Sequence, residues 1–292
     1  MLKAVLLVIA AMVAFAANSL LCRMALVSTN IDPSSFTIIR LLSGAVSLLF
    51  LSIVFYVSQS RSQEAERLIV MMKQNASVAG GMALFVYALC FSFAYISMAT
   101  GTGALLLFGT VQITMIAVGL MKGERFSPSQ WLGFSFAIIG LVILLLPSSS
   151  APSMLSAILM ILAGFAWGAY SLIGKSATSP LVASAGNFVL ASALCVPLAA
   201  VVLLTGAKIN IDPTGSLYAL ASGMLASGAG YAIWYAALPL IKSTTAATVQ
   251  LSVPIIATFM GWAILKESLN ITIIAASLAT LGGILLVIRQ RN

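Results

Sequence analysis

The stretch Phe15-Ala16-Ala17-Asn18-Ser19-Leu20-Leu21-Cys22-Arg23 recurs later in the chain as Trp167-Gly168-Ala169-Tyr170-Ser171-Leu172-Ile173-Gly174-Lys175. Each copy begins with an aromatic residue, has serine at its fifth position and ends on a basic residue. The recurrence indicates an internal duplication. An odd number of membrane spans in each copy would invert one copy relative to the other, an arrangement found in many secondary transporters.

The composition of the chain indicates that most of it is embedded in a lipid bilayer. Of the 292 residues, 61% are hydrophobic and 7% are charged, and the mean hydropathy is +1.14. Soluble domains carry about 25% charged residues, so the composition predicts an all-α polytopic membrane protein. A bilayer core about 30 Å thick needs roughly 20 apolar residues per helix. We expect ten transmembrane helices, at residues 4–22, 34–57, 76–98, 102–121, 129–146, 154–174, 181–204, 214–238, 243–264 and 271–288.

The duplication extends along the whole chain. The matched positions are Pro33 with Pro180, Arg40 with Asn187, Glu124 with Glu267, and Gly140 with Gly283. Residues 1–147 and 148–292 are therefore predicted to form two repeats of five helices each. Because five is an odd number, we expect the second repeat to be inverted.

The basic residues predict the orientation of the chain. The side shared with the N-terminus collects Lys3, Arg61, Arg67, Lys73, Lys122, Arg125, Lys175, Lys242, Arg289 and Arg291, whereas the other side has Arg23, Arg40, Lys208 and Lys266. The positive-inside rule then places both termini in the cytoplasm. The apolar run after Lys3 also resembles a secretory signal, but it matches the sixth span, so we expect the first span to be retained.

The hairpin before the fifth span contains helix-start signals. Ser127-Pro128-Ser129-Gln130 reads as an N-cap, a proline at the first helical position and a capping-box glutamine, and Asn270 is a cap at the matching place. Glu124 and Glu267 are then expected near helix N-termini, where a carboxylate complements the macrodipole and ties the hairpin. This structural role is favoured over substrate contact.

These residues carry a family resemblance. The Trp-Gly-x-x-Ser stretch ending in Lys175, the Pro33 and Arg40 pair, and the hairpins Gly123-Glu124-Arg125-Phe126-Ser127 and Lys266-Glu267-Ser268-Leu269 resemble the paired EamA repeats of the drug/metabolite transporter superfamily. The resemblance implies a ten-helix inner-membrane carrier of small metabolites, similar to the branch that exports aromatic and other amino acids. Three departures predict an asymmetric site: Phe15-Ala16 replaces Trp-Gly, Val111 stands opposite Pro254, and Asn187 stands where arginine would be.

The acidic residues bear on chemistry and coupling. All six, Asp32, Glu64, Glu66, Glu124, Asp212 and Glu267, fall in predicted connections, and the chain has no histidine. An intramembrane hydrolase would need a serine and histidine pair or a metal site, and a prenyl-transfer enzyme would need acidic clusters that hold magnesium. We therefore expect no enzyme, metal or cofactor. A proton-coupled pump usually has a carboxylate or histidine inside the membrane. The sequence therefore favours an uncoupled carrier.

Four polar or helix-breaking residues lie inside predicted spans. Arg40 is about five residues into the second span, where it either snorkels or pairs structurally, or holds the carboxylate of a substrate. Pro254 removes the helical partner of the carbonyl of Gln250 near the bilayer midplane, and polar groups lining a cavity can satisfy such a carbonyl. Gln112 is similarly central. Gln250 and Gln112 are candidate substrate contacts, with bridging between helices as the alternative.

Aromatic residues form the rest of the predicted site. Tyr87, Phe91 and Tyr95 share one helical face, and Tyr231, Trp234 and Tyr235 share another. We expect Tyr95, Trp234 and Tyr235 in the interfacial aromatic belt, and Tyr87 and Tyr231 stacked on substrate. Trp167, Tyr170 and Ser171 near one end, with Asn18 and Ser19 near the other, are candidate substrate contacts and opposed gates.

Together these patterns predict an alternating-access carrier, and the family resemblance implies that it exports amino acids or similar small metabolites. The alternatives are a proton-coupled multidrug exporter and a non-transporting pore or receptor. The expected partners are a small-molecule substrate and the lipid bilayer. The net charge of +8 does not indicate nucleic-acid binding, because the basic residues are scattered between spans. A monomer and a homodimer both fit the sequence.

Overall fold

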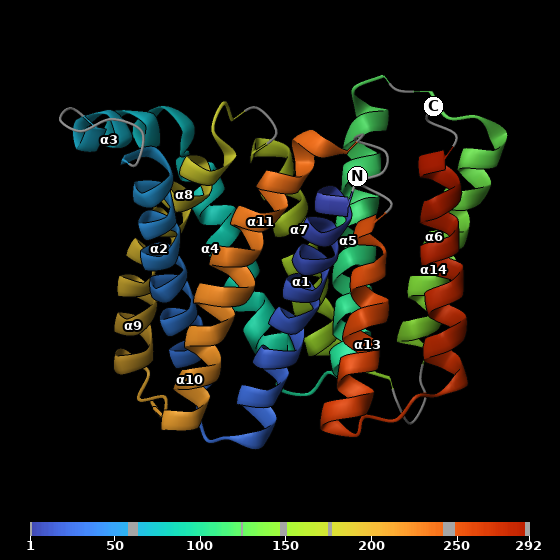
Figure 1. Cartoon of the computed structure of the whole chain (residues 1–292). Helices are drawn as coiled ribbons and strands as arrows, with labels where there is room; N and C mark the ends of the chain where they lie inside the picture. Colours follow the sequence, from blue (N-terminus) through green and yellow to red (C-terminus); the bar gives the residue numbers. More distant parts are fainter. Residues whose placement is uncertain are drawn as a thin grey trace.

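The computed structural model describes residues 2–57, 64–123, 125–146, 151–174, 177–241 and 249–289, and within these ranges it contains helices and no strand. The helices stand side by side, with both marked ends of the chain toward the top of Figure 1. We call this the terminal end and the other the opposite end. Glu124 and Lys175 lie outside the described residues.

The first half of the chain contributes six helices. They are α1 (Leu2–Ser28), α2 (Pro33–Val57), α3 (Glu64–Asn75), α4 (Val78–Ala94), α5 (Thr100–Met121) and α6 (Pro128–Leu145). The second half contributes α7 (Met154–Gly174), α8 (Pro180–Ala193), α9 (Cys195–Leu204), α10 (Pro213–Ala221), the π-helix η1 (Ser222–Ala229), α11 (Gly230–Ala237), the 3₁₀-helix η2 (Leu238–Leu240), α13 (Ser252–Leu265) and α14 (Ile271–Arg289).

The described helices account for most of the predicted spans. Seven are long and apolar enough to cross a membrane, counting α8 and α9 as one, or eight if the bent pair α3–α4 is included. Of the ten predicted spans, the three that are not among these seven helices correspond to α4, to the composite α10–η1–α11, and to α13. The all-helical membrane fold is thus confirmed, and the count of ten stays a prediction.

The first helices of the two halves, α1 and α7, run in opposite directions. Arg23, late in α1, donates from Nη1 to the carbonyl oxygens of Tyr95 and Ile96 at the end of α4, both at 2.8 Å. Ser97, in the same connection, lies 2.6 Å from the hydroxyl of Ser156 in the first turn of α7. The late part of α1 and the beginning of α7 therefore meet the same end of α4. These two helices correspond to each other in the duplication, and they run in opposite directions.

The connection between the predicted spans 34–57 and 76–98 contains α3. This helix lies across the terminal end and packs on α2 and α8 (Figure 1). Leu68, Met71 and Met72 lie at i, i+3 and i+4 and so share one apolar face of this helix. Leu68 is buried, and Met71 and Met72 are partly buried. Between α3 and α4 the chain bends by 76°. An amphipathic helix at this level suits the membrane interface.

Two predicted spans are interrupted. Residues 181–204 divide at Leu194 into α8 and α9, because Pro197 has no N–H to continue the helix and its ring crowds the preceding turn. Residues 214–238 contain η1, where the backbone changes to π-helical hydrogen bonding. Such segments often occur at functional sites.

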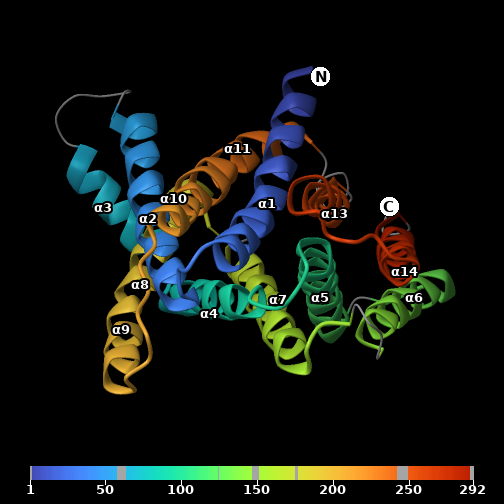
Figure 2. The ribbon, with the colours of Figure 1, turned by 90° about the horizontal axis from the view of Figure 1, so that it is seen from below.

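The helix-start signals before α6 are confirmed. Ser127 accepts from the backbone N–H of Gln130 at 3.3 Å, and the side chain of Gln130 accepts from the N–H of Ser127 at 2.9 Å. At the matching place Asn270 accepts from the N–H of Ile273 at 2.9 Å. The two helices that begin with these caps, α6 and α14, pack as a pair at one edge of the bundle (Figure 2).

Replacing Gly283 with alanine should loosen this pair. A Cβ at Gly283 would meet the carbonyl oxygen of Gly133 and lie 2.6 Å from the backbone nitrogen of Ala137, neither of which can move alone. We expect a loss of about 1–3 kcal/mol of stability, measured as a lower unfolding temperature in detergent. Gly282→Ala is the matched control, since its Cβ would have no neighbour within 4 Å. Equal unfolding temperatures would contradict this packing.

Candidate substrate cavity

A cavity extends from the middle of the bundle to the terminal end. Its wide part has a volume of about 420 Å³. The lining comes from α1, α5, α7, α11 and the segments beside them: Phe15, Val111, Gln112, Met115, Trp167, Tyr170, Ser171, Gly174, Ala177, Pro180, Tyr231, Trp234, Tyr235, Leu238 and Gln250. Gly174, Ala177 and Pro180 belong to the end of α7 and the start of α8, so this part reaches the terminal end.

Toward the opposite end the cavity narrows to a volume of about 20 Å³, enough for about one water molecule. The narrow part shares Phe15, Trp167, Tyr231 and Gln250 with the wide part. Its other lining residues are Asn18, Ser19, Tyr87, Phe91, Leu107, Phe108, Ala226 and Ser227. The last two come from η1, so the π-helical segment supplies part of the wall.

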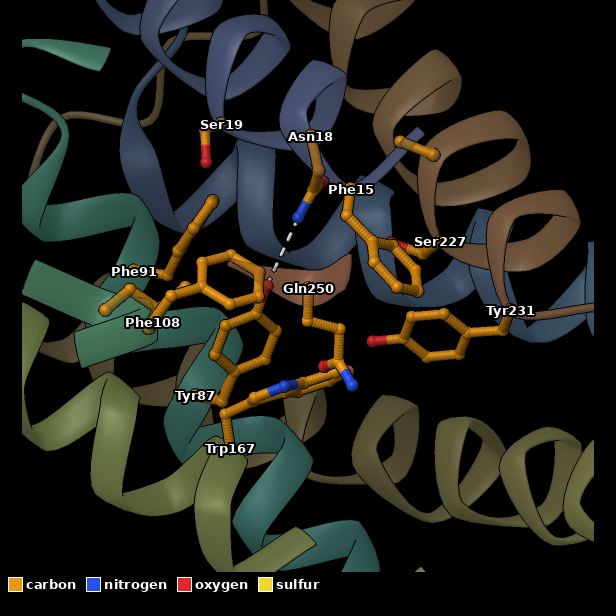
Figure 3. Close-up of a pocket in the computed structure, with 12 residues that line it drawn as sticks. Phe15, Asn18, Ser19, Tyr87, Phe91, Phe108, Trp167, Ser227, Tyr231 and Gln250 are labelled. Atoms are coloured by element: carbon orange, nitrogen blue, oxygen red, sulfur yellow. Dashed lines mark hydrogen bonds between the residues drawn. The ribbon is translucent and has the colours of Figure 1, made fainter. Parts of the chain in front are cut away.

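Four aromatic residues surround the junction of the two parts, and we call them the aromatic ring set: Phe15, Tyr87, Trp167 and Tyr231. Their side chains point toward one another in Figure 3. Ring centroids are 4.8 Å apart for Tyr87 and Trp167, 5.5 Å for Trp167 and Tyr231, and 5.8 Å for Phe15 and Tyr231. Phe15 and Trp167 are equivalent in the duplication, and α4 and α11, which carry the tyrosines, are partner helices. The set is thus approximately two-fold symmetric.

A buried hydrogen-bond network lies beside the narrow part. Asn18 donates from Nδ2 to the hydroxyl of Tyr87 at 3.2 Å, and Ser222 donates to Oδ1 of Asn18 at 2.6 Å. Ser222 begins η1. The network therefore connects α1, α4 and the π-helical segment. Ser19, the other predicted gate residue on α1, lines the same narrow part and is 1% exposed.

The wide part contains a second polar cluster. The Ser184 hydroxyl on α8 lies 3.1 Å from the hydroxyl of Tyr170 and 3.1 Å from the hydroxyl of Tyr235. Ser171 also lines this part, and its hydroxyl donates to the carbonyl oxygen of Trp167 at 2.8 Å. Gln112 lines it from α5.

Arg40 does not snorkel. Its side chain is 1% exposed, and Nη2 donates to the hydroxyl of Tyr87 at 3.0 Å. The guanidinium carbon lies 5.1 Å from the ring centroid of Tyr87 and 4.9 Å from that of Phe91. The snorkelling interpretation is wrong because Arg40 faces the interior of the bundle. It stands behind the cavity wall and is absent from both linings.

The expected aromatic belt is also corrected. Tyr95 is completely buried, and its hydroxyl donates to the carbonyl oxygen of Thr100 at 3.2 Å. Trp234 and Tyr235 line the wide part of the cavity. These three residues were predicted at the membrane interface because they lie near the ends of their spans. Their side chains instead face the interior of the bundle.

Near Pro254 the helix is interrupted. Gln250 is helical, Leu251 forms a turn, and α13 begins at Ser252, two residues before the proline. Ser252 donates to the carbonyl oxygen of Val249 at 2.6 Å. Gln250 reaches both parts of the cavity, whereas Pro254 is buried outside the lining.

Contacts around Glu267 join three segments of the chain at the opposite end. Its carboxylate accepts from the N–H of Thr100 at 2.8 and 3.0 Å and from the Thr100 hydroxyl at 3.1 Å, and it lies 3.5 Å from Nε of Arg23. Glu267 therefore caps α5 rather than its own hairpin, because the left-handed residue Lys266 turns the chain back after α13. We call Arg23, Thr100 and Glu267 the seal. Arg23 thus contacts both the end of α4 and Glu267.

Sequence reasoning missed several of these residues. The seal joins α1, α5 and the α13–α14 connection, which no local pattern brings together. Phe15 lies in the repeated stretch and corresponds to Trp167, so the duplication itself was a usable signal. Ser222 and Ser227 depend on the π-helical segment, for which we find no local sequence signal.

Comparisons with known proteins agree with this architecture. The model of the EamA-like transporter family matches residues 2–146 and 154–289. A relative from Pseudomonas aeruginosa, described as an uncharacterised protein, is 46% identical over 289 residues, covering 99% of this chain and 96% of the relative. An uncharacterised transporter of Archaeoglobus fulgidus is 25% identical over 211 residues, covering 69% of this chain and 72% of its own.

A solved structure shares the fold. This crystal structure of a protein aligns with a TM-score of 0.65 at 16% identity, covering 99% of this chain and 98% of the other. At this identity the likeness concerns the fold alone. The family model, by contrast, covers nearly the whole chain in two copies, one in each half. The chain therefore belongs to the EamA-like transporter family, as a multi-pass membrane transporter with two EamA repeats.

Proposed function

We propose that the protein exports amino acids, aromatic ones among them, or chemically similar small metabolites by alternating access. The observation that carries this proposal is the difference between the two ends of one cavity. The wide part reaches the terminal end, while the seal closes the opposite end. With the termini in the cytoplasm of the cell (inner) membrane, this is an inward-open state. A pore would require a continuous path.

The lining supports a solute that is partly apolar. The aromatic ring set offers faces for stacking, and Gln112, Gln250 and Ser171 provide hydrogen-bonding groups. Ligand sites of this kind combine an apolar wall with a few polar groups that orient the ligand. A volume of about 420 Å³ is within the range of small-molecule sites.

The described carboxylates favour uncoupled transport. Asp32 accepts from the N–H groups of Ser34 and Ser35 at the start of α2, and Asp212 accepts from the N–H of Gly215 at the start of α10. Like Glu267, both carboxylates accept hydrogen bonds from N–H groups at the start of a helix, and all three lie at the opposite end of the bundle. A proton relay normally places a titratable group within the substrate path. We therefore propose facilitated diffusion of the solute down its own gradient, in a monomer or homodimer.

Counter-flow in proteoliposomes tests the proposal. Vesicles loaded with each unlabelled amino acid in turn should accumulate the same labelled amino acid transiently, with aromatic ones giving the largest signals. Accumulation should continue when a protonophore collapses the pH gradient. Loss of the signal under the protonophore would overturn the uncoupled mechanism, and absence of counter-flow for all twenty would overturn the substrate class.

A pair of tryptophan variants controls this experiment. Trp167→Ala removes the member of the aromatic ring set that contacts Tyr87 and Tyr231, and we expect uptake at low substrate to fall about tenfold. Trp131→Ala removes an outward-facing indole of α6 that is 49% exposed. That variant should transport like the wild type. Equal losses in both would mean that the measured signal does not report on the cavity.

A further inference from the structure

The guanidinium of Arg40 has more hydrogen-bond donors than the surrounding protein accepts. Nη2 donates to the Tyr87 hydroxyl, but Nε and Nη1 are buried and have no partner in the described part of the chain. Within that part, the ion pair of the bundle joins Arg23 to Glu267, and no carboxylate pairs with Arg40. Since arginine stays protonated in proteins, a full charge is buried with no counter-ion among the described side chains.

The neighbours of Arg40 offset its charge only in part. The faces of Tyr87 and Phe91 lie within cation–π range of the guanidinium. Ring faces nevertheless do not accept the remaining N–H groups as a carboxylate would. Charged residues inside membrane bundles commonly mark substrate or ion pathways. A bound anion would supply both the counter-charge and the acceptors that are missing here.

Tyr87 connects Arg40 to the cavity. Its hydroxyl accepts from Arg40 and from Asn18, which occupies both lone pairs and leaves the hydroxyl hydrogen free to donate. Oδ1 of Asn18 is engaged by Ser222, so the amide presents its N–H side to Tyr87. Tyr87 itself lines the narrow part. Donors, and no anionic acceptor, therefore gather at the blind end of the cavity.

We propose that Arg40 and Tyr87 form the subsite for the carboxylate of the transported solute, which names the substrate class and rests on the proposed function. The apolar body of the solute then lies against the aromatic ring set. In the state seen here the rings of Tyr87 and Phe91 cover the guanidinium, and the carboxylate reaches it when these rings turn aside. Solutes without a carboxylate are excluded.

The equivalent position in the other repeat has a different role. Asn187 is buried, and its Oδ1 accepts from the backbone N–H of Ser77 at 2.9 Å, just before α4. This amide supports the start of a helix and carries no charge. The cationic subsite therefore belongs to one half of the otherwise two-fold arrangement, so a solute binds with one orientation.

Ligand binding to the purified full-length protein tests the subsite without transport. The probes are 3-phenylpropionate and its neutral isostere 3-phenylpropionamide, and the readout is the unfolding temperature as a function of probe concentration. We expect the wild type to bind the acid at least about tenfold more tightly than the amide. Arg40→Gln should bind both equally, and Arg40→Lys should keep a weaker preference for the acid.

Lys208→Gln is the matched control, since it removes one positive charge from an exposed position and should keep the wild-type preference. Equal binding of acid and amide by the wild type would overturn the proposal, as would an unchanged preference in Arg40→Gln. If Arg40→Gln does not fold, the proposal is tested by the acid–amide preference of the wild type and by whether Arg40→Lys shows a weaker preference than the wild type. Stabilisation by chloride as strong as that by the acid would identify a free-ion site and overturn the carboxylate assignment.

Transport and binding results separate the two proposals. If counter-flow fails but the acid preference depends on Arg40, the proposed function is wrong and the subsite stands. If counter-flow succeeds while acid and amide bind equally, the function stands and the subsite is wrong.

Discussion

In Glu267→Ala, the opposite end of the bundle should open. A cysteine placed at Ser19 should react about tenfold faster with a membrane-impermeant thiol reagent applied from that side than it does with Glu267 present. Ser19 lies one turn before Arg23 on α1 and lines the narrow part of the cavity, directly behind the seal. Its reactivity therefore reports whether the seal is open.

The size of the effect follows from the hydrogen bonds and the ion pair that alanine cannot form. The Glu267 carboxylate accepts from the N–H and hydroxyl of Thr100 at the start of α5 and faces Nε of Arg23. Loss of a capping side chain costs about 0.5–2 kcal/mol. Since about 1.4 kcal/mol corresponds to a tenfold change in an equilibrium, the open population should rise by roughly that factor. The variant that conserves shape, Glu267→Gln, should have a smaller effect.

The measurement requires a background in which Cys22, Cys90 and Cys195 are replaced by alanine. Asp212→Ala is the matched control: it also removes a capping carboxylate at the opposite end, but this residue contacts Gly215 and takes no part in the seal. Labelling at Ser19 should be unchanged in that control. A labelling rate in Glu267→Ala equal to that of the parent would show that the seal does not set the closed state.

Local patterns predicted most of the helices but not their interruptions. The hydropathy pattern placed α7 at the observed residues, and the signals at Ser127 and Gln130 identified the start of α6. Such signals act within a few residues of each other. Pro197, by contrast, was available in the sequence as the cause of the break before α9. The π-helix η1 packs closely against α2, where a Cβ on Gly223 would meet the carbonyl oxygen of Arg40, and this contact joins segments far apart in the sequence.

The candidate site was predictable where it follows helical periodicity and the duplication. Tyr87, Trp167 and Tyr231 fall on inward faces of their helices, and the structure brings them together. The environment of Arg40 was not predictable, because its depth in the sequence says nothing about which neighbours surround it. The seal depended on contacts between residues 23, 100 and 267, which only the packing of three helices creates.

Tryptophan substitutions at Ser19 and Ser171 are expected to trap opposite states, and both should abolish transport. Ser19 is 1% exposed beside a void of about 20 Å³, which cannot hold an indole, so Ser19→Trp excludes the closed form of the opposite end. Ser171 faces the wide part, of about 420 Å³, where an indole fits. Ser171→Trp therefore keeps the state seen here and prevents the terminal end from closing.

A single reporter distinguishes the two traps. The reporter is Ser227→Cys, which lies on η1 in the narrow part of the cavity. In the cysteine-free background, a membrane-impermeant thiol reagent is applied to one side of oriented vesicles at a time. With Ser19→Trp, labelling from the side opposite the termini should increase, whereas Ser171→Trp should leave only labelling from the terminal side. Excluding one state by about 3 kcal/mol lowers its population roughly a hundredfold, so transport should fall to about 1% in each.

The same helices provide the controls for the added bulk. Val13→Trp on α1 and Leu162→Trp on α7 place the indole at outward-facing positions that are 41% and 46% exposed. Both variants should transport and label like the parent, because bulk on the outer surface obstructs neither conformation. Alternating access requires that the two ends open in turn. Labelling of Ser227→Cys from the same side in both traps would show instead that Ser19 and Ser171 obstruct one and the same passage.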